Sequence, residues 1–233
     1  MILFLGDSFT WGQGLPIEKW LKEGKSLDYC NRLPPEYPSE LYNYEDDNYR
    51  KQNHFPNLVA KHFNKSYVTK WGNGGSNQQS VFLLNNAWMQ MDTNAVDFIV
   101  FQFTEVSRDL DLLRDGEYDG KVSFEEYIDN YIDKQIDKIN SFCKNTLKKP
   151  WFAFSWNEEI GDKLEKNYPK NYVPLIIDGK EFNNFNDVFA NHNEFMLCKI
   201  EGIHDGHFNS KGHEMIANSI IKKVNLFYHG NNK

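Results

Sequence analysis

An apolar segment that ends in the turn Gly6-Asp7-Ser8 opens the chain and restricts its fold. Residues 2–5 carry no polar side chain, a pattern typical of a β-strand buried on both faces. The turn is therefore expected to place a serine hydroxyl at the carboxyl end of a buried strand, where α/β proteins gather binding and catalytic groups. Glycine, aspartate and serine are also common in ordinary turns, so this segment alone leaves a purely structural connection open.

Near the other end of the chain, a histidine precedes a segment with helical periodicity. Apolar residues recur there at intervals of three and four, which predicts a helix to about residue 227: Ile216, Ile220, Val224 and Phe227. Asn209 or Ser210 is the expected N-cap, which places His207 in the loop before the helix. A lone histidine is usually structural, but His207 differs from the others because Asp205 stands two positions before it.

These two segments together contain the residue types of a nucleophilic triad. A serine hydroxyl is a poor nucleophile until an imidazole takes its proton, and a carboxylate must fix the tautomer of that imidazole. The sequence therefore makes Ser8 the candidate nucleophile, His207 the candidate base and Asp205 the candidate orienting acid. Such a mechanism needs no cofactor and no metal.

Three motifs carry a resemblance to a known family. In chain order they are Gly6-Asp7-Ser8, Gly74-Gly75-Ser76-Asn77 and Asp205-x-His207-x-Asn209-x-x-Gly212. This series resembles the SGNH hydrolase (GDSL esterase/lipase) superfamily and extends over nearly the whole chain. The resemblance implies a nucleophilic Ser8, a proton-accepting His207 and an oxyanion-binding backbone N–H at Gly74.

Two positions depart from the family pattern. The family's third motif, Gly-x-Asn-Asp after a buried strand, is missing, and that segment offers Gln102 or Thr104 as a side-chain donor, or no third donor at all. The last motif usually reads Asp-x-x-His, which places His204 where the acid is expected. Asp205 is the expected orienting acid, and Glu201 is the alternative.

Apolar segments and helical patterns alternate along the chain. The expected strands are residues 1–6, 66–71, 98–103, 151–156 and 195–200, and the expected helices include 54–63, 77–91 and 123–147. This alternation predicts an α/β fold, a three-layer α/β/α sandwich around a mostly parallel five-stranded sheet, and the resemblance implies its flavodoxin-like form. We expect a single domain over residues 1–233, with an irregular insertion at about 15–52.

Composition restricts the partners. A formal charge of −7 argues against a basic surface for nucleic acid or for an anionic membrane. The three cysteines are widely spaced and lack metal-site spacing, which is typical of free thiols in a reducing compartment. Because we find no signal-peptide pattern and no apolar run of about 18 residues, we expect a cytoplasmic protein. The oligomeric state stays open.

The expected substrate is a small-molecule or carbohydrate ester, with deacetylation as the chemistry. Trp11, three positions after Ser8, is the candidate sugar-stacking side chain, and the polar insertion is expected to help recognise the alcohol. Two alternatives remain, an acyltransferase that uses the same residues and a non-catalytic carbohydrate-binding or structural module with a degraded site. The missing third motif favours the module, whereas Ser8 and His207 favour the enzyme.

Overall fold

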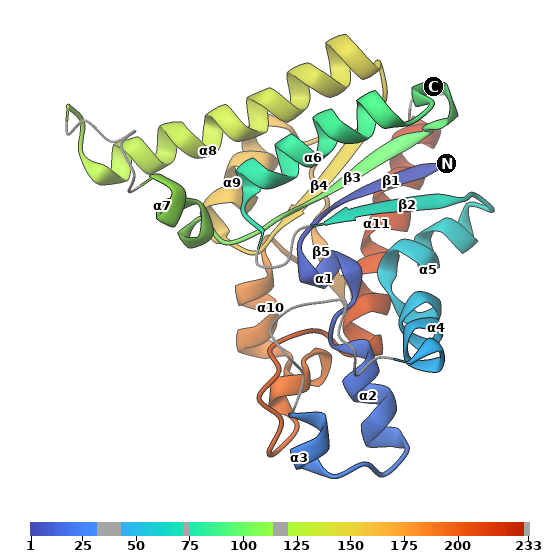
Figure 1. The fold of residues 1–233 in the computed structure, drawn as a ribbon. Helices are drawn as coiled ribbons and strands as arrows, with labels where there is room; N and C mark the ends of the chain where they lie inside the picture. The colour runs from blue at the N-terminus through green and yellow to red at the C-terminus, as the bar shows by residue number, and fades with distance from the viewer. Residues whose placement is uncertain (32–42, 72–74, 114–120, 231–233) are drawn as a thin grey trace.

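A four-stranded parallel sheet forms the centre of the protein in a computed structural model that describes residues 1–31, 43–71, 75–113 and 121–230 (Figure 1). The strand order is β2-β1-β3-β4. The strands are β1 Ile2–Gly6, β2 Tyr67–Trp71, β3 Phe98–Phe103 and β4 Trp151–Ser155. Because β1 lies between β2 and β3, the winding of the chain reverses at the carboxyl ends of β1 and β3. Binding sites in open α/β sheets form at such a point.

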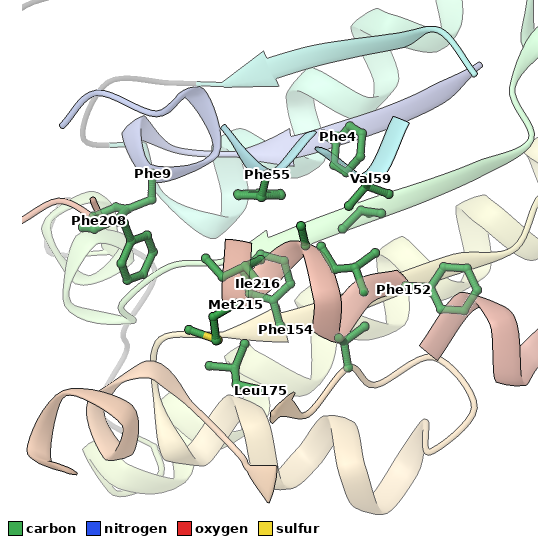
Figure 2. Close-up of a cluster of buried hydrophobic side chains, with 14 of the residues drawn as sticks. Phe4, Phe9, Phe55, Val59, Phe152, Phe154, Leu175, Phe208, Met215 and Ile216 are labelled. Carbon is green, nitrogen blue, oxygen red and sulfur yellow. The ribbon is translucent and has the colours of Figure 1, made fainter. Parts of the chain in front are cut away.

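Helices cover both faces of this sheet. On one face, residues such as Leu5 and Ile99 pack against α6 Asn77–Gln90, α8 Phe124–Ser141 and α9 Glu158–Asn167. On the other, residues such as Phe4 and Phe152 pack against α5 Phe55–His62 and α11 Ser210–Gly230 (Figure 2). β1, β3 and β4 are buried on both faces, which explains their continuous apolar sequences. The result is a three-layer α/β/α arrangement.

The predicted last strand, residues 195–200, is wrong. This segment contains the end of the 3-10 helix η3 Asn193–Phe195 and all of the 3-10 helix η4 Leu197–Lys199. Among the described residues, its strand pairing is one antiparallel bridge between Met196 and Phe208. Leu197 is fully buried in a small cluster with Ile17 of the neighbouring helix. Leu197 is therefore apolar because it is buried against a helix and not because it belongs to the sheet.

A separate antiparallel hairpin follows β4 in the chain, in a region for which no strand is predicted. It consists of β5 Leu175–Ile177 and β6 Lys180–Phe182. Its turn residues Asp178 and Gly179 have φ of 49° and 81°, the left-handed values that a two-residue type I′ turn requires. The chain before the hairpin makes only a single parallel bridge to β4 among the described residues, so the sheet ends there at four strands.

The segment predicted as an irregular insertion is helical where the structure describes it. It contains α2 Leu15–Lys22, α3 Leu27–Cys30 and α4 Tyr44–Asn53, and residues 32–42 lie outside the described part of the chain. Lys19 of α2 pairs with the buried Asp46 of α4 at 2.8 Å, which joins the two helices. Pro16 lies in the first turn of α2, where proline favours the start of a helix.

Shorter elements complete the connections. They are α1 Ser8–Trp11, η1 Thr93–Ala95, α7 Ser107–Leu113, η2 Phe142–Leu147 and α10 Phe185–Asn191. The helix predicted over residues 123–147 has the expected extent but changes type, because α8 continues directly into the π-helix η2 at Phe142 and the chain turns at Lys148, whose φ is 53°. Over the residues that the structure describes, no helix combines the length and the apolar character that a bilayer crossing requires.

Candidate active site

Ser8 is held at the carboxyl end of β1 by a tightly packed turn. A Cβ on Gly6 would lie 2.2 Å from Thr10 Oγ1, so a side chain at this position would displace the turn. Asp7 is the N-cap of α1 and accepts a hydrogen bond from Phe9 N at 2.9 Å. Ser8 is the first residue of α1 and is 4 % exposed. The hydroxyl therefore has a fixed position at the end of the sheet.

The imidazole of His207 lies between Ser8 and Asp205. Nε2 is 2.7 Å from Ser8 Oγ, and Nδ1 is 2.9 Å from Asp205 Oδ1. The same carboxylate oxygen accepts the backbone N–H of His207 at 2.8 Å. Because an ionised carboxylate only accepts, Nδ1 carries the imidazole hydrogen and the Nε2 lone pair faces the serine hydroxyl. This arrangement suits proton transfer from Ser8 Oγ to Nε2.

Asp205, and not Glu201, occupies the position against His207 Nδ1. Burial raises the pKa of the Asp205 carboxyl, but the hydrogen bonds and charge of His207 lower it by more, so the net shift is downward. Asp205 is therefore ionised at neutral pH. Glu201 is exposed to solvent. The Phe9 ring packs on the imidazole of His207, with centroids 4.4 Å apart.

Asp7 is the centre of a buried hydrogen-bond network that the sequence analysis missed. Its side chain is 1 % exposed. Among the described residues, four groups donate to its carboxylate: Phe9 N at 2.9 Å and Gln102 Nε2 at 2.7 Å to Oδ1, and Thr104 Oγ1 at 3.0 Å and an Arg108 guanidinium nitrogen at 2.8 Å to Oδ2. Since Gln102 and Thr104 lie at the end of β3, the network joins that strand to the serine turn.

Gln102 and Thr104 have contacts that differ from their predicted oxyanion role. The single hydroxyl hydrogen of Thr104 and one amide hydrogen of Gln102 are directed at Asp7. Gln102 Oε1 also accepts the Thr10 hydroxyl at 2.6 Å, which fixes the orientation of the amide. Both side chains are 2 % exposed. In this arrangement they support the turn that carries Ser8 instead of presenting donors to a substrate.

The predicted oxyanion glycine, Gly74, lies outside the described residues, and its role stays a prediction. The residues just after it begin α6, where Ser76 is the N-cap. The Asn77 side chain accepts the backbone N–H of Thr104 at 2.8 Å and donates to the carbonyl of the same residue at 3.2 Å. Asn77 thus ties the start of α6 to the end of β3, beside the Asp7 network.

Trp11 is not the open sugar-stacking platform that the sequence predicts. Its side chain is 5 % exposed. The guanidinium of Arg50 lies 3.7 Å from the centre of the Trp11 ring, and the Trp71 ring lies 5.2 Å away. Arg50 also donates to the Trp11 carbonyl at 2.7 Å. Because protein groups already cover the indole, a sugar has little of it to contact.

The loop before α11 contains residue types that can bind metals. Asp205 and His207 are engaged with each other, and His204 is exposed. Within residues 1–31, 43–71, 75–113 and 121–230, no group of three or more histidine, cysteine, aspartate or glutamate side chains is arranged to hold a metal ion.

Comparisons with known proteins give structural matches but no sequence match. No protein-family model matches the chain, and comparison with curated proteins finds no match. Among solved structures, the chain is similar to LAE5, an α/β hydrolase enzyme from the metagenome of Lake Arreo, Spain. The TM-score is 0.51 and the identity 13 %, over 97 % of this chain and 95 % of LAE5. At this identity the likeness shows a shared fold.

Two further solved structures each give a TM-score of 0.48. One is a protein from Desulfitobacterium hafniense DCB-2 described as lipolytic and of the G-D-S-L family, at 9 % identity over 95 % of this chain and 98 % of that one. The other is a carbohydrate esterase, at 16 % identity over 96 % of this chain and 67 % of that one. The described residues form an α/β fold, and the TM-score of 0.51 shows that LAE5 shares this overall fold.

Proposed function

We propose that this protein is a serine ester hydrolase in which Ser8 is the nucleophile, His207 the general base and Asp205 the orienting acid. The proposal rests on two hydrogen bonds to one imidazole, 2.7 Å from Nε2 to Ser8 Oγ and 2.9 Å from Nδ1 to Asp205 Oδ1. Both distances are suitable for a nucleophile, its base and the group that orients the base. The three residues also stand where α/β sheets place their chemistry.

In this mechanism, Ser8 Oγ attacks the carbonyl carbon of the ester while its proton moves to His207 Nε2. The carbonyl oxygen becomes an oxyanion, and the backbone N–H groups of Ser8 and Gly74 are its proposed donors. When the tetrahedral intermediate collapses, the bond to the alcohol breaks, the alcohol takes the proton from Nε2, and Ser8 remains acylated. Water then attacks the acyl-enzyme with His207 again as base, which releases the acid and restores the Ser8 hydroxyl.

Asp205 and Asp7 have separate roles in this proposal. Asp205 holds the hydrogen on His207 Nδ1 and stabilises the imidazolium that forms during attack. Asp7 is buried and is surrounded by four donors, so it holds the turn on which Ser8 stands.

For the substrate we propose an acetyl ester of a carbohydrate. Polar side chains that are at least partly exposed follow β3 or precede Asp205: Glu105, Ser107, Arg108 and His204. Side chains of this kind can hydrogen-bond to sugar hydroxyls, whereas a long acyl chain needs an extended apolar groove.

A fluorophosphonate probe tests the nucleophile, because it forms a stable adduct with an activated serine that mass spectrometry can locate. We expect one adduct, on Ser8, that is lost in Ser8→Ala and His207→Ala and retained in Ser66→Ala, which removes an exposed serine just before β2. A folded wild-type protein with no adduct on Ser8 contradicts the enzyme and favours the non-catalytic binding module. Acetyl transfer to an added alcohol in preference to water would instead identify an acyltransferase.

A further inference from the structure

Glu18 belongs to α2, outside the proposed catalytic residues, yet it caps the helix that follows His207. Ser210, the first residue of α11, donates its backbone N–H to Glu18 Oε2 at 2.8 Å and its hydroxyl to Oε1 at 2.7 Å. Glu18 is 9 % exposed. A carboxylate is favoured at a helix N-terminus because it accepts unpaired N–H groups and lies at the positive end of the helix dipole. Glu18 therefore fixes the end of the histidine loop across 192 positions of sequence.

α2 meets the same loop a second time, one turn before Glu18. A Cβ on Gly14, the N-cap of α2, would lie 2.8 Å from His207 Cβ and 2.9 Å from the Phe208 carbonyl oxygen. The backbone of α2 therefore touches the loop at His207 itself. Gly14 and Glu18 are four positions apart and so lie on one side of the helix.

A continuous hydrogen-bonded backbone connects these contacts to Ser8. Gly12 N and Gln13 N donate to the Ser8 carbonyl at 3.0 and 3.1 Å. Glu18 N donates to the Gly14 carbonyl at 3.3 Å, so the segment is ordered by backbone bonds from the nucleophile to Glu18. Elsewhere on the loop, the His207 carbonyl accepts Leu197 N at 2.9 Å.

We propose that Glu18 is a positioning residue that sets the distance between Ser8 Oγ and His207 Nε2. This inference rests on the proposed function. It gives Glu18, which lies in the segment predicted as an insertion, a role in that function. Glu18 touches no reacting atom, and it acts through Ser210 on the loop that carries His207. The geometry of a catalytic pair is sensitive, since a misplacement of about 1 Å can lower a rate about 100-fold.

Three variants separate positioning from charge. Glu18→Ala removes both acceptors, whereas Glu18→Gln can still accept the Ser210 N–H through its oxygen and donate to the Ser210 hydroxyl through its nitrogen. We expect Glu18→Ala to lower kcat by about 10- to 100-fold with little change in KM, and Glu18→Gln to recover most of this loss. Lys22→Ala removes an exposed lysine that pairs with Glu18 Oε1 at 2.8 Å, and it should retain the wild-type kcat. Unchanged kcat in Glu18→Ala, or an equal loss in Glu18→Gln, would overturn the proposal.

A readout that needs no turnover distinguishes this proposal from the proposed function. In proton NMR, the Nδ1 hydrogen of His207 bound to Asp205 should give a protected low-field resonance in the wild type, in Glu18→Gln and in Lys22→Ala. We expect it to broaden or disappear in Glu18→Ala while circular dichroism shows a folded chain. If Ser8 forms no fluorophosphonate adduct, the esterase is wrong but this measurement still decides the role of Glu18. An unchanged His207 resonance in Glu18→Ala would contradict the positioning role, whether or not kcat changes in that variant.

Ser210→Ala extends the series if Glu18→Ala does not fold. This variant loses the 2.7 Å hydroxyl bond and keeps the 2.8 Å backbone bond to Glu18. We expect Ser210→Ala to have a lower kcat than Glu18→Gln and to show partial broadening of the His207 resonance. A wild-type kcat together with a wild-type resonance in Ser210→Ala would count against the proposal.

Discussion

Ser8 Oγ and His207 Nε2 lie 2.7 Å apart, although 199 positions separate the two residues. The contact arises because Ser8 begins α1 at the end of β1, while His207 precedes α11, which packs on one face of the same sheet. The neighbour of His207, Phe208, reaches into that core and packs against Phe9, the neighbour of Ser8, with ring centroids 5.0 Å apart (Figure 2). The packing of adjacent side chains thus brings the hydroxyl and the imidazole together.

The first prediction concerns the acid that orients His207. Asp205→Asn should lower kcat on a p-nitrophenyl ester by up to about 10⁴-fold, because an amide at this position favours the wrong imidazole tautomer. Glu201→Gln, which changes an exposed carboxylate in the same loop, should retain kcat. Steady-state kinetics of both variants checks this. A lower kcat in Glu201→Gln together with an unchanged kcat in Asp205→Asn would show that Glu201, and not Asp205, orients His207.

The serine and histidine segments could be predicted because each signal is local. Ser8 follows an uninterrupted apolar strand, and His207 precedes a helix with clear periodicity. Asn209, one of the two predicted N-caps, accepts the Gly212 N–H at 3.1 Å. In each case the neighbouring residues in the sequence determine the local structure, so the sequence alone was sufficient to predict the strand before Ser8 and the helix after His207.

The support of the site could not be predicted because it depends on distant partners. Asp7 is an ordinary turn residue by sequence, and its bonds to Gln102, Thr104 and Arg108 cross 95 to 101 positions. One signal was present, since polar side chains on a strand buried on both faces must find partners. The hairpin beyond β4 also had a signal, the Asp178-Gly179 pair, which is typical of a two-residue turn.

The second prediction concerns the Asp7 network. Asp7→Asn replaces one carboxylate oxygen with an amide that donates, so at least one of the four present donors loses its acceptor inside the protein. We expect the free energy of unfolding to fall by about 3 kcal/mol and kcat to fall as the Ser8 turn loosens. Arg108→Met leaves Asp7 with its three neutral donors and should cost less, about 1 kcal/mol. Urea unfolding measures the free energy of unfolding of both variants. Equal stability of Asp7→Asn and the wild type would contradict the role of Asp7 in supporting the Ser8 turn.

The third prediction concerns the acyl group. If the site takes acetyl esters, kcat/KM should be higher for p-nitrophenyl acetate than for p-nitrophenyl octanoate, because Glu105, Ser107, Arg108 and His204 give the site polar side chains. p-Nitrophenyl butyrate, which has an intermediate chain length, tests whether kcat/KM falls gradually as the acyl chain lengthens. A higher kcat/KM for octanoate would contradict the acetyl preference and indicate a lipase-like site.

The fourth prediction is a loss of stability in mild acid that arises from two buried histidines. Burial and then the charge of Arg50 lower the pKa of His54 to about 3, and burial and neighbouring charges lower that of His213. Both imidazoles are therefore neutral in the folded protein, whereas in the unfolded chain they bind a proton below about pH 6.5. The unfolded state gains protons first as the pH falls, so the free energy of unfolding decreases by up to about 1.4 kcal/mol per pH unit for each histidine.

The pH range of the histidine effect on stability differs from the pH range in which Asp205 affects stability. The pKa of Asp205 is lowered on folding, so its contribution to stability is present at neutral pH and is lost only as the pH falls below about 3.9. Urea unfolding between about pH 7 and pH 5 therefore isolates the histidines. We expect His54→Gln to reduce the pH slope of the unfolding free energy, and His229→Gln, which removes an exposed histidine, to preserve it. An unchanged slope in His54→Gln would show that His54 does not resist protonation in the folded protein.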